Sequence, residues 1–241
     1  MNKRSNGKMK YRMLSILGLV IFFGVWEAAV RLGWVSHRSL NAPSEVVETF
    51  IYKLTNANPD GSTLPQHFFQ SLKLALTSFI IATIIGVPLG WIMGYYKVAD
   101  FLLNPLFEII RPIPPIAWIP IVILTMGIGM SAKVFIIFVA AFVPNVINSY
   151  LGIRLTDATL INVAKTFGAS DWKIFTTVCI PSSMNMVFTG IRLSLNASWT
   201  TLVAAEMLAS IRGLGYMIQM GRTIIRPDIS IVGMFTIGLT G

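Results

Sequence analysis

Long apolar blocks separated by short polar stretches set the pattern of this sequence. Five blocks hold at most one charged residue each: 13–30, 74–96, 112–132, 134–153 and 182–205. The two charges inside them are Glu27 and Arg192. A helix crosses the hydrocarbon core of a bilayer with roughly 20 apolar residues. Each block is long enough to do so, whereas the core of a soluble domain requires no such lengths.

The last apolar block, 229–241, is shorter than the others. Its 13 residues rise about 1.5 Å each in a helix, so they fall short of a hydrocarbon core about 30 Å thick. The block is either an incomplete sixth helix of a truncated chain, which we favour, or a segment lying in the interface. The pattern therefore predicts an all-α polytopic membrane protein of about six transmembrane helices, the last one truncated.

Glycines and prolines modify two of the predicted helices. In helix 71–95, glycines recur every four residues at Gly86, Gly90 and Gly94, which predicts a close helix contact along one face. Residues 97–111 are predicted to be a short charged connection on the inner side. The proline cluster that follows must start the next helix late or break it. Because non-helical backbone at membrane depth survives only in protein or beside a watery cavity, the cluster marks either a translocation path or a loop at the membrane surface.

Composition agrees with this pattern and excludes some functions. The chain is 54% hydrophobic and 12% charged, whereas soluble domains carry about 25% charged residues. Its net charge is +9, but the basic residues form no amphipathic or aromatic-interleaved stripe, so no nucleic-acid partner is expected. The single cysteine, Cys179, excludes an intramolecular disulfide framework and a multi-cysteine metal site. We expect no metal.

The amino-terminal residues carry the signal for orientation. Five basic residues lie in segment 1–12, directly before the first apolar block, which predicts a cytoplasmic tail under the positive-inside rule. The 18 apolar residues that follow exceed a usual signal-peptide core of about 7–15, and no small-residue cleavage site follows, so we favour a retained anchor. Segment 13–241 is then the transmembrane domain.

The polar segment 31–70 is placed outside by this topology. Within it, residues 44–54 are predicted to form a short amphipathic helix on the membrane surface. His37 and His67 both fall in this segment, and we interpret them as solvated loop positions.

The inner segment 157–180 is the most informative part of the chain. Apolar residues at spacing i, i+3, i+4, i+7 predict one face of a helix; they are Leu160, Val163, Ala164 and Phe167. A second apolar stripe follows the break at Gly168 and is predicted to stop at Pro181, before the helix 183–208. Such a helix pair either fills a groove on a partner protein or rests on lipid head groups, and spacing alone leaves both open.

The same segment resembles a known family. The run 162–168, Asn-Val-Ala-Lys-Thr-Phe-Gly, followed by Pro181, is similar to the signature loop of binding-protein-dependent ABC importer permeases. That loop reads Glu-Ala-Ala, three residues, Gly, nine residues, Ile-x-Leu-Pro. This chain departs from it at Asn162 and Val163. Segments 111–120 and 127–129, with Trp26-Glu27, Pro43-Ser44, 202–207 and 213–215, resemble the branch that handles aliphatic sulfonates, taurine and nitrate.

The resemblance implies a site and a set of partners. Segment 157–180 would be the coupling helix pair that docks on a separate ABC ATPase subunit. The coupling residues implied are Asn162, Ala164, Lys165, Phe167, Gly168, Ala169, Ser170, Asp171, Trp172 and Pro181. Further partners implied are an extracytoplasmic substrate-binding protein, a second permease copy in a homodimer, and membrane lipid. The location implied is the bacterial cell (inner) membrane, with multiple crossings.

The sequence lacks the phosphate-binding motif expected of an ATPase. It contains no G-x-x-x-x-G-K-[ST] loop to cradle phosphates, so we expect a non-catalytic subunit that binds no cofactor, with ATP used by the partner ATPase. The cargo expected from the resemblance is a small anionic nutrient. A secondary transporter or channel working without ATP is the alternative, although no internal repeat of the kind it requires is evident.

The residues expected along a translocation path are Pro114, Pro115, Trp118, Asn145, Asn148, Arg192 and Trp199. Asn145 and Asn148 either line a pore or bond between helices. Arg192 lies near the middle of its helix, where a charge is costly and often functional. It either attracts an anion or pairs with Glu27 or a carbonyl. Glu206, near the outer end of the same helix, is expected to be structural.

Overall fold

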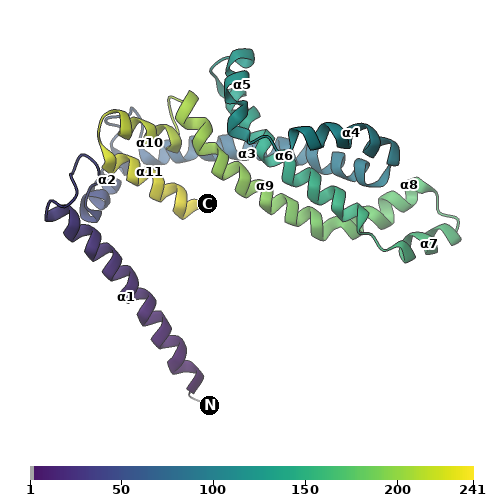
Figure 1. Cartoon of the computed structure of the whole chain (residues 1–241), viewed down its shortest axis with the longest axis horizontal. Coiled ribbons are helices and arrows are strands. Elements are labelled where there is room, and N and C mark those ends of the chain that lie inside the picture. Colours follow the sequence, from purple (N-terminus) through teal and green to yellow (C-terminus); the bar gives the residue numbers. More distant parts are fainter. Residues whose placement is uncertain (1–2) are drawn as a thin grey trace. The chain divides into compact units, whose positions relative to one another are not determined.

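The structure is a computed structural model that describes residues 3–241, with side chains described for residues 11–207 and 210–241. This part of the chain is helical and contains no strand (Figure 1). The elements in order are α1 (Lys3–Arg31), α2 (Pro43–Thr55), α3 (Leu64–Tyr95), α4 (Lys97–Ile110), the 3₁₀ turn η1 (Pro115–Trp118), α5 (Ile119–Met126), α6 (Met130–Arg154), α7 (Ala158–Thr166), α8 (Asp171–Ile174), the π-helical segment η2 (Phe175–Cys179), α9 (Ile180–Ala209), α10 (Leu214–Thr223) and α11 (Pro227–Thr240).

The helix lengths confirm an all-α polytopic membrane protein. Four described helices are long and apolar enough to cross a membrane: Tyr11–Arg31, Leu64–Tyr95, Met130–Arg154 and Asp171–Met207. The bent pair α4–α5 makes a fifth when it is counted as one span. Helix α11 is a shorter apolar helix. The basic side chains expected in segment 3–10 lie outside the described side chains.

The chain forms two compact units. One comprises the residues up to His67 together with Met217–Thr240, and the other comprises Phe68–Tyr216.

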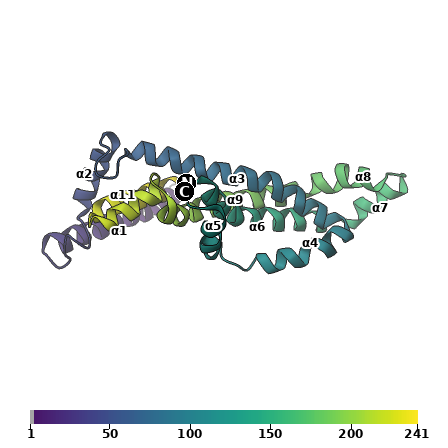
Figure 2. The same ribbon diagram turned by 90° about the horizontal axis from the view of Figure 1, so that it is seen from above.

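Helices α3, α6 and α9 form the centre of the second unit (Figures 1 and 2). A β-carbon on Gly86 of α3 would lie 3.0 Å from Asn145 of α6. Two turns later, one on Gly94 would lie 2.8 Å from Ile153, so α3 and α6 run in the same direction. The glycine stripe is therefore a close helix contact, as the sequence predicts. Helix α9 packs against α6 in the opposite direction, because a β-carbon on Gly152 would lie 2.8 Å from Ser183 and one on Gly190 would lie 2.8 Å from Asn148.

The chain between α3 and α6 differs from the prediction. Segment 97–111 is not a short connection, because residues Lys97–Ile110 form α4. Its axis is bent by 88° from the following segment Pro115–Met126. The break coincides with Pro112 and Pro114, which lack backbone N–H donors. Since α3 and α6 are parallel, the chain between them must return from one end of the bundle to the other, so α4 and α5 together cross it.

Buried polar side chains tie the three central helices together. Asn145 is 0% exposed, and its amide donates to Thr83 Oγ1 on α3 at 3.1 Å and to Ser194 Oγ on α9 at 2.9 Å. Near the end of α9, Ser71 Oγ donates to the buried carboxylate of Glu206 at 2.8 Å. The Gly215 N–H donates to the same carboxylate at 2.9 Å. Glu206 therefore holds α3, α9 and the start of α10 together, which is the structural role expected of it.

The first unit is built on α2 and α11. Helix α2 confirms the helix predicted for 44–54. Glu27 of α1 accepts hydrogen bonds from Ser44 (Oγ at 2.8 Å and N at 3.1 Å) and pairs with Arg31 at 2.5 Å. Within its own unit, the Glu27 carboxylate is thus engaged by Arg31 and Ser44.

A buried charge cluster closes the loop between α2 and α3. Lys53 Nζ lies 2.5 Å from Asp60 Oδ1, and His67 Nε2 lies 3.2 Å from Asp60 Oδ2, with all three side chains 0% exposed. The solvated position expected for His67 is therefore wrong, whereas His37 is exposed. Burial alone would raise the pKa of Asp60, but hydrogen bonds and charges from His67 and Lys53 outweigh it and hold that pKa below its ordinary value.

Candidate functional site

Segment 157–180 forms the predicted helix–joint–helix arrangement around a glycine. Asp157 caps α7 by accepting a hydrogen bond from the Thr159 N–H at 2.8 Å, and this bond lowers the pKa of Asp157. Helix α7 ends at Thr166 with Phe167 as its C-cap, and Gly168 follows with φ +77°. Glycine adopts this left-handed conformation without the clash that a β-carbon causes. Ser170 then caps α8 by accepting from the Lys173 N–H.

The predicted stop at Pro181 is wrong. Residues Asp171–Met207 form one helix of 37 residues, and Pro181 lies in the first turn of α9. The π-helical segment Phe175–Cys179 precedes it, and the N–H of Ile180 donates to the carbonyl of Phe175, five residues earlier. This wider turn shifts the hydrogen-bond register, so the helix accommodates a residue without an N–H.

The apolar residues of α7 divide between two faces. Ile161 and Ala164 pack against a buried cluster that contains Ile174 and Phe175. The outward face carries exposed apolar side chains: Leu160 (51% exposed), Val163 (48%) and Phe167 (86%), with Trp172 (65%) beyond the joint. The predicted stripe therefore holds for Leu160, Val163 and Phe167, but Ala164 belongs to the inner face. We call Leu160, Val163, Phe167 and Trp172 the outward apolar face.

The remaining residues expected in coupling are also placed by the structure. Asn162, Lys165, Gly168, Ser170 and Asp171 are exposed, whereas Ala169 packs with the inner face of α7. The segment is attached to the bundle at the end where α3 terminates. There Tyr95 Oη donates to the Asp171 carbonyl at 3.0 Å, and the Tyr95 and Phe175 rings lie 4.9 Å apart.

A hollow of about 310 Å³ lies where the α4–α5 span breaks. Its lining comprises Arg111, Ile113, Pro115, Val139, Ala140, Val143, Pro144, Ala197, Thr200 and Thr201. Most of these groups are apolar, and Arg111 supplies the charge. Its Nη1 lies 3.0 Å from Glu108 Oε1, and both side chains are about half exposed, at 48% and 53%. We call this the mid-span hollow.

The residues expected along a translocation path are only partly gathered there. Pro115 lines the mid-span hollow, and Pro114 is exposed in the break beside it. Trp118 and Trp199 are half-buried and pack against the central apolar cluster. Asn145 and Asn148 lie in helix contacts, with the Asn148 amide donating to the Pro144 carbonyl at 2.8 Å.

Two kinds of lining residue were missed by the sequence reasoning. Arg192 is exposed but does not line the hollow, whereas Arg111 does. Arg111 was assigned to an inner connection, although its position directly before the proline cluster was a usable signal. Thr200 and Thr201 gave no signal, because hydroxyl residues are common in transmembrane helices.

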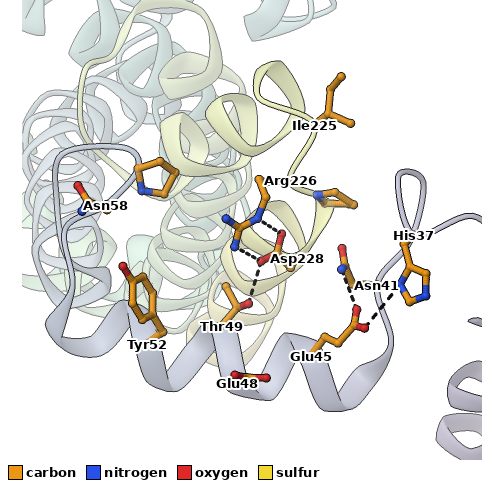
Figure 3. A pocket seen from close by; sticks show the side chains of 12 residues that line it. His37, Asn41, Glu45, Glu48, Thr49, Tyr52, Asn58, Ile225, Arg226 and Asp228 are labelled. Carbon is orange, nitrogen blue, oxygen red and sulfur yellow. Dashed lines mark hydrogen bonds and ion pairs between the residues drawn. The ribbon is translucent and has the colours of Figure 1, made fainter. Parts of the chain in front are cut away.

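A second, polar hollow of about 550 Å³ lies in the first unit, between α2 and the α10–α11 turn (Figure 3). Arg226 donates to both carboxylate oxygens of Asp228, at 2.9 and 2.6 Å, and Thr49 Oγ1 donates to the same carboxylate at 2.8 Å. Ile225, at its edge, has φ +57°, which is unusual for a β-branched residue. Because Arg226 is paired with Asp228, its positive charge is neutralised within the hollow.

Comparison with known proteins places this geometry in context. Residues 86–240 match the family model described as binding-protein-dependent transport system inner membrane component. The taurine transport system permease protein of Escherichia coli is 33% identical over 229 residues, covering 94% of this chain and 82% of that protein. A putative aliphatic sulfonates transport permease of E. coli is 33% identical over 217 residues, covering 90% and 81%. The nitrate import permease of Synechocystis is 30% identical over 207 residues, covering 84% and 75%.

Proposed function

Because the chain belongs to the family of binding-protein-dependent transport system inner membrane components, and is thus an ABC transporter permease, we propose that it imports a small anion under the drive of a separate ATPase subunit. Taurine, aliphatic sulfonates and nitrate are the cargoes named for its relatives. The chain itself would bind no ATP and catalyse no reaction.

The observation that carries the proposal is the outward apolar face. Leu160 and Val163 lie on the short helix α7 and Phe167 is its C-cap, and α7 is not among the helices long enough to cross a membrane; Trp172 lies at the start of the helix Asp171–Met207. Phe167 and Trp172 are 86% and 65% exposed, and an apolar helix face of this kind is what a groove on a partner protein accepts. Exposed Asn162, Lys165 and Asp171 surround it with polar groups, as at the rim of an interface.

The attachment of this face to the bundle supports a mechanical role. The segment from Asp171 runs without interruption into α9, and α9 packs along α6. A displacement of α7 by a closing ATPase would therefore pass through the joint at Gly168 into α9. The mid-span hollow lies on the far part of the same helix, so movement of α9 would alter access to it.

Orientation follows from the topology of the bundle. With the basic amino terminus in the cytoplasm, and with α4 and α5 counted as one crossing, segment 157–180 emerges on the cytoplasmic side, where an ATPase is reached. The opposite end would receive an extracytoplasmic binding protein, and a second copy of the chain in the bacterial inner membrane would complete the path.

Co-purification and transport test this function. A tagged chain, expressed with its neighbouring genes, should retain an ATPase subunit and support ATP-dependent uptake of labelled ethanesulfonate into proteoliposomes. An ATP-independent transporter would show uptake without nucleotide and retain no ATPase.

The joint gives a sharper test. Gly168→Pro should abolish coupled uptake, because φ +77° is closed to a ring fixed near −65°. Gly168→Asn is the matched control, since asparagine tolerates the left-handed conformation. Full coupling in a well-expressed Gly168→Pro protein would refute the transmission of movement from α7 through this joint into α9.

A further inference from the structure

We propose that the mid-span hollow binds a small organic oxyanion, with Arg111 holding the charged head and the apolar wall of α6 and α9 holding a short aliphatic chain. The proposal rests on the transport function above and names the class of cargo and the residues that select it.

The mid-span hollow lies well away from both ends of α6. Pro144 in its wall stands 14 residues after Met130 and 10 before Arg154 (144 − 130 and 154 − 144). At about 1.5 Å per residue, it lies about 21 and 15 Å from the two ends of α6. An irregular backbone break at such a depth persists only in protein or beside a watery cavity. The hollow at the break is therefore placed where a cargo crosses.

The mid-span hollow carries a positive charge. Arg111 is the cationic side chain lining the hollow, and its guanidinium carries five N–H donors in a planar fork that fits the oxygens of a carboxylate, phosphate or similar oxyanion. The ion pair with Glu108 engages one terminal nitrogen, Nη1, at 3.0 Å, and the Arg111 side chain is still 48% exposed. Donors thus remain for a ligand, and a charge at this depth is typically functional.

Hydroxyl groups add a second contact on α9. The Thr200 hydroxyl donates to the carbonyl of Asn196 at 3.0 Å. Among the described residues, the structure gives the Thr201 hydroxyl no hydrogen-bond partner, so its proton is available to an oxyanion. Arg111 and Thr201 come from different helices, and a ligand that touches both would join the broken span to α9.

The rest of the lining discriminates between anions. Val139, Val143 and Ala197 present methyl groups, which offer nothing to a bare inorganic anion such as nitrate. A methylene group buried against such a wall tightens binding about fourfold. The volume of about 310 Å³ is near the lower end of the range of about 300–1,000 Å³ for ligand sites. The hollow therefore suits a short alkyl oxyanion.

Direct binding to the permease tests this without the selectivity of a binding protein. Ethanesulfonate is titrated into the purified chain in detergent, with the ATPase subunit where it co-purifies, and binding is followed by saturation-transfer NMR. Arg111→Gln should raise the dissociation constant about 10- to 100-fold, because a charge-assisted hydrogen bond is lost. Thr201→Val should raise it severalfold. Lys97→Gln, which removes a charge from the other end of α4, is the matched control and should leave binding unchanged.

The ligand series supplies the second arm. Butanesulfonate should bind about 16-fold more tightly than ethanesulfonate, from two further methylenes, and nitrate should bind most weakly. The proposal is overturned if Arg111→Gln binds ethanesulfonate as the unaltered chain does, if Arg192→Gln rather than Arg111→Gln weakens binding, or if nitrate competes as well as butanesulfonate. Loss of the ATPase from the preparation would instead count against the transport function, since the binding measurement does not require it.

Discussion

Replacing Phe167 with alanine separates docking from folding. The ring is 86% exposed, so its removal leaves the packing of the single chain almost unchanged. If a partner groove buries the ring, the loss is about 1.5–3 kcal/mol of transfer free energy. Each 1.4 kcal/mol is a tenfold change in the dissociation constant, so we expect about 10- to 100-fold weaker retention of the ATPase subunit.

The assay titrates purified ATPase subunit onto the tagged permease in detergent and measures the thermal unfolding midpoint of the same samples. Leu124→Ala is the matched control, because Leu124 is 85% exposed and lies on α5, near the opposite end of the bundle. The expected result is weak retention for Phe167→Ala alone, with both midpoints unchanged. Equal retention by both variants, or an equal loss in both, would refute the assignment of the outward apolar face as the docking surface.

Three further predictions concern stability, each measured as a thermal unfolding midpoint in detergent. Gly90→Ala should lower this midpoint, because overpacking costs about 1–3 kcal/mol of folding free energy and the added β-carbon would lie 2.5 Å from the Val146 carbonyl oxygen. Gly24→Ala should leave the midpoint unchanged, because nothing lies within 4 Å of its added β-carbon. The pKa of Asp60 lies below its ordinary value of 3.8, so its ionised form stabilises the fold above about pH 3.8 and that contribution is lost as the pH falls through the folded-state pKa. Asp60→Asn should therefore lower the midpoint at neutral pH and flatten its acid dependence; an unchanged acid slope would contradict this. Ile225→Gly should raise the midpoint, because Ile225 has φ +57° and glycine relieves about 1 kcal/mol of backbone strain there. A lower midpoint would show that the isoleucine side chain stabilises the fold by more than the strain costs.

Local patterns were sufficient for much of the candidate site. The i, i+3, i+4, i+7 spacing in α7 predicted a helix with an apolar face, and Gly168 predicted the joint, because both depend on residues within two turns of one another. The prediction of a helix end at Pro181 is wrong for a related reason. A proline ends a regular α-helix, but the π-helical turn before it depends on the packing of Phe175 and Cys179 against α7 and α3, which the local pattern does not contain.

The central helices show the same division. The glycine stripe of α3 predicted a close helix contact but not which helix makes it. The contacts of Gly86 and Gly94 show that the partner is α6 and that the two helices run in the same direction. The four charged residues of segment 97–111 predict a connection. Its apolar side, with Phe107 buried against Phe142, makes it a helix of the bundle.

The sequence predicted about six crossings, whereas the described helices give four, or five with the bent pair α4–α5. By itself it determined that the chain is a multi-pass helical membrane protein and where a short helix pair separates the long apolar helices. These properties follow from the length and period of apolar runs, which are local. Only the tertiary structure decided that Arg111 rather than Arg192 lines a hollow, that His67 is buried with Asp60, and which residues of α7 face outward. Each of these depends on contacts between helices far apart in sequence, and such contacts are set by how whole faces pack together.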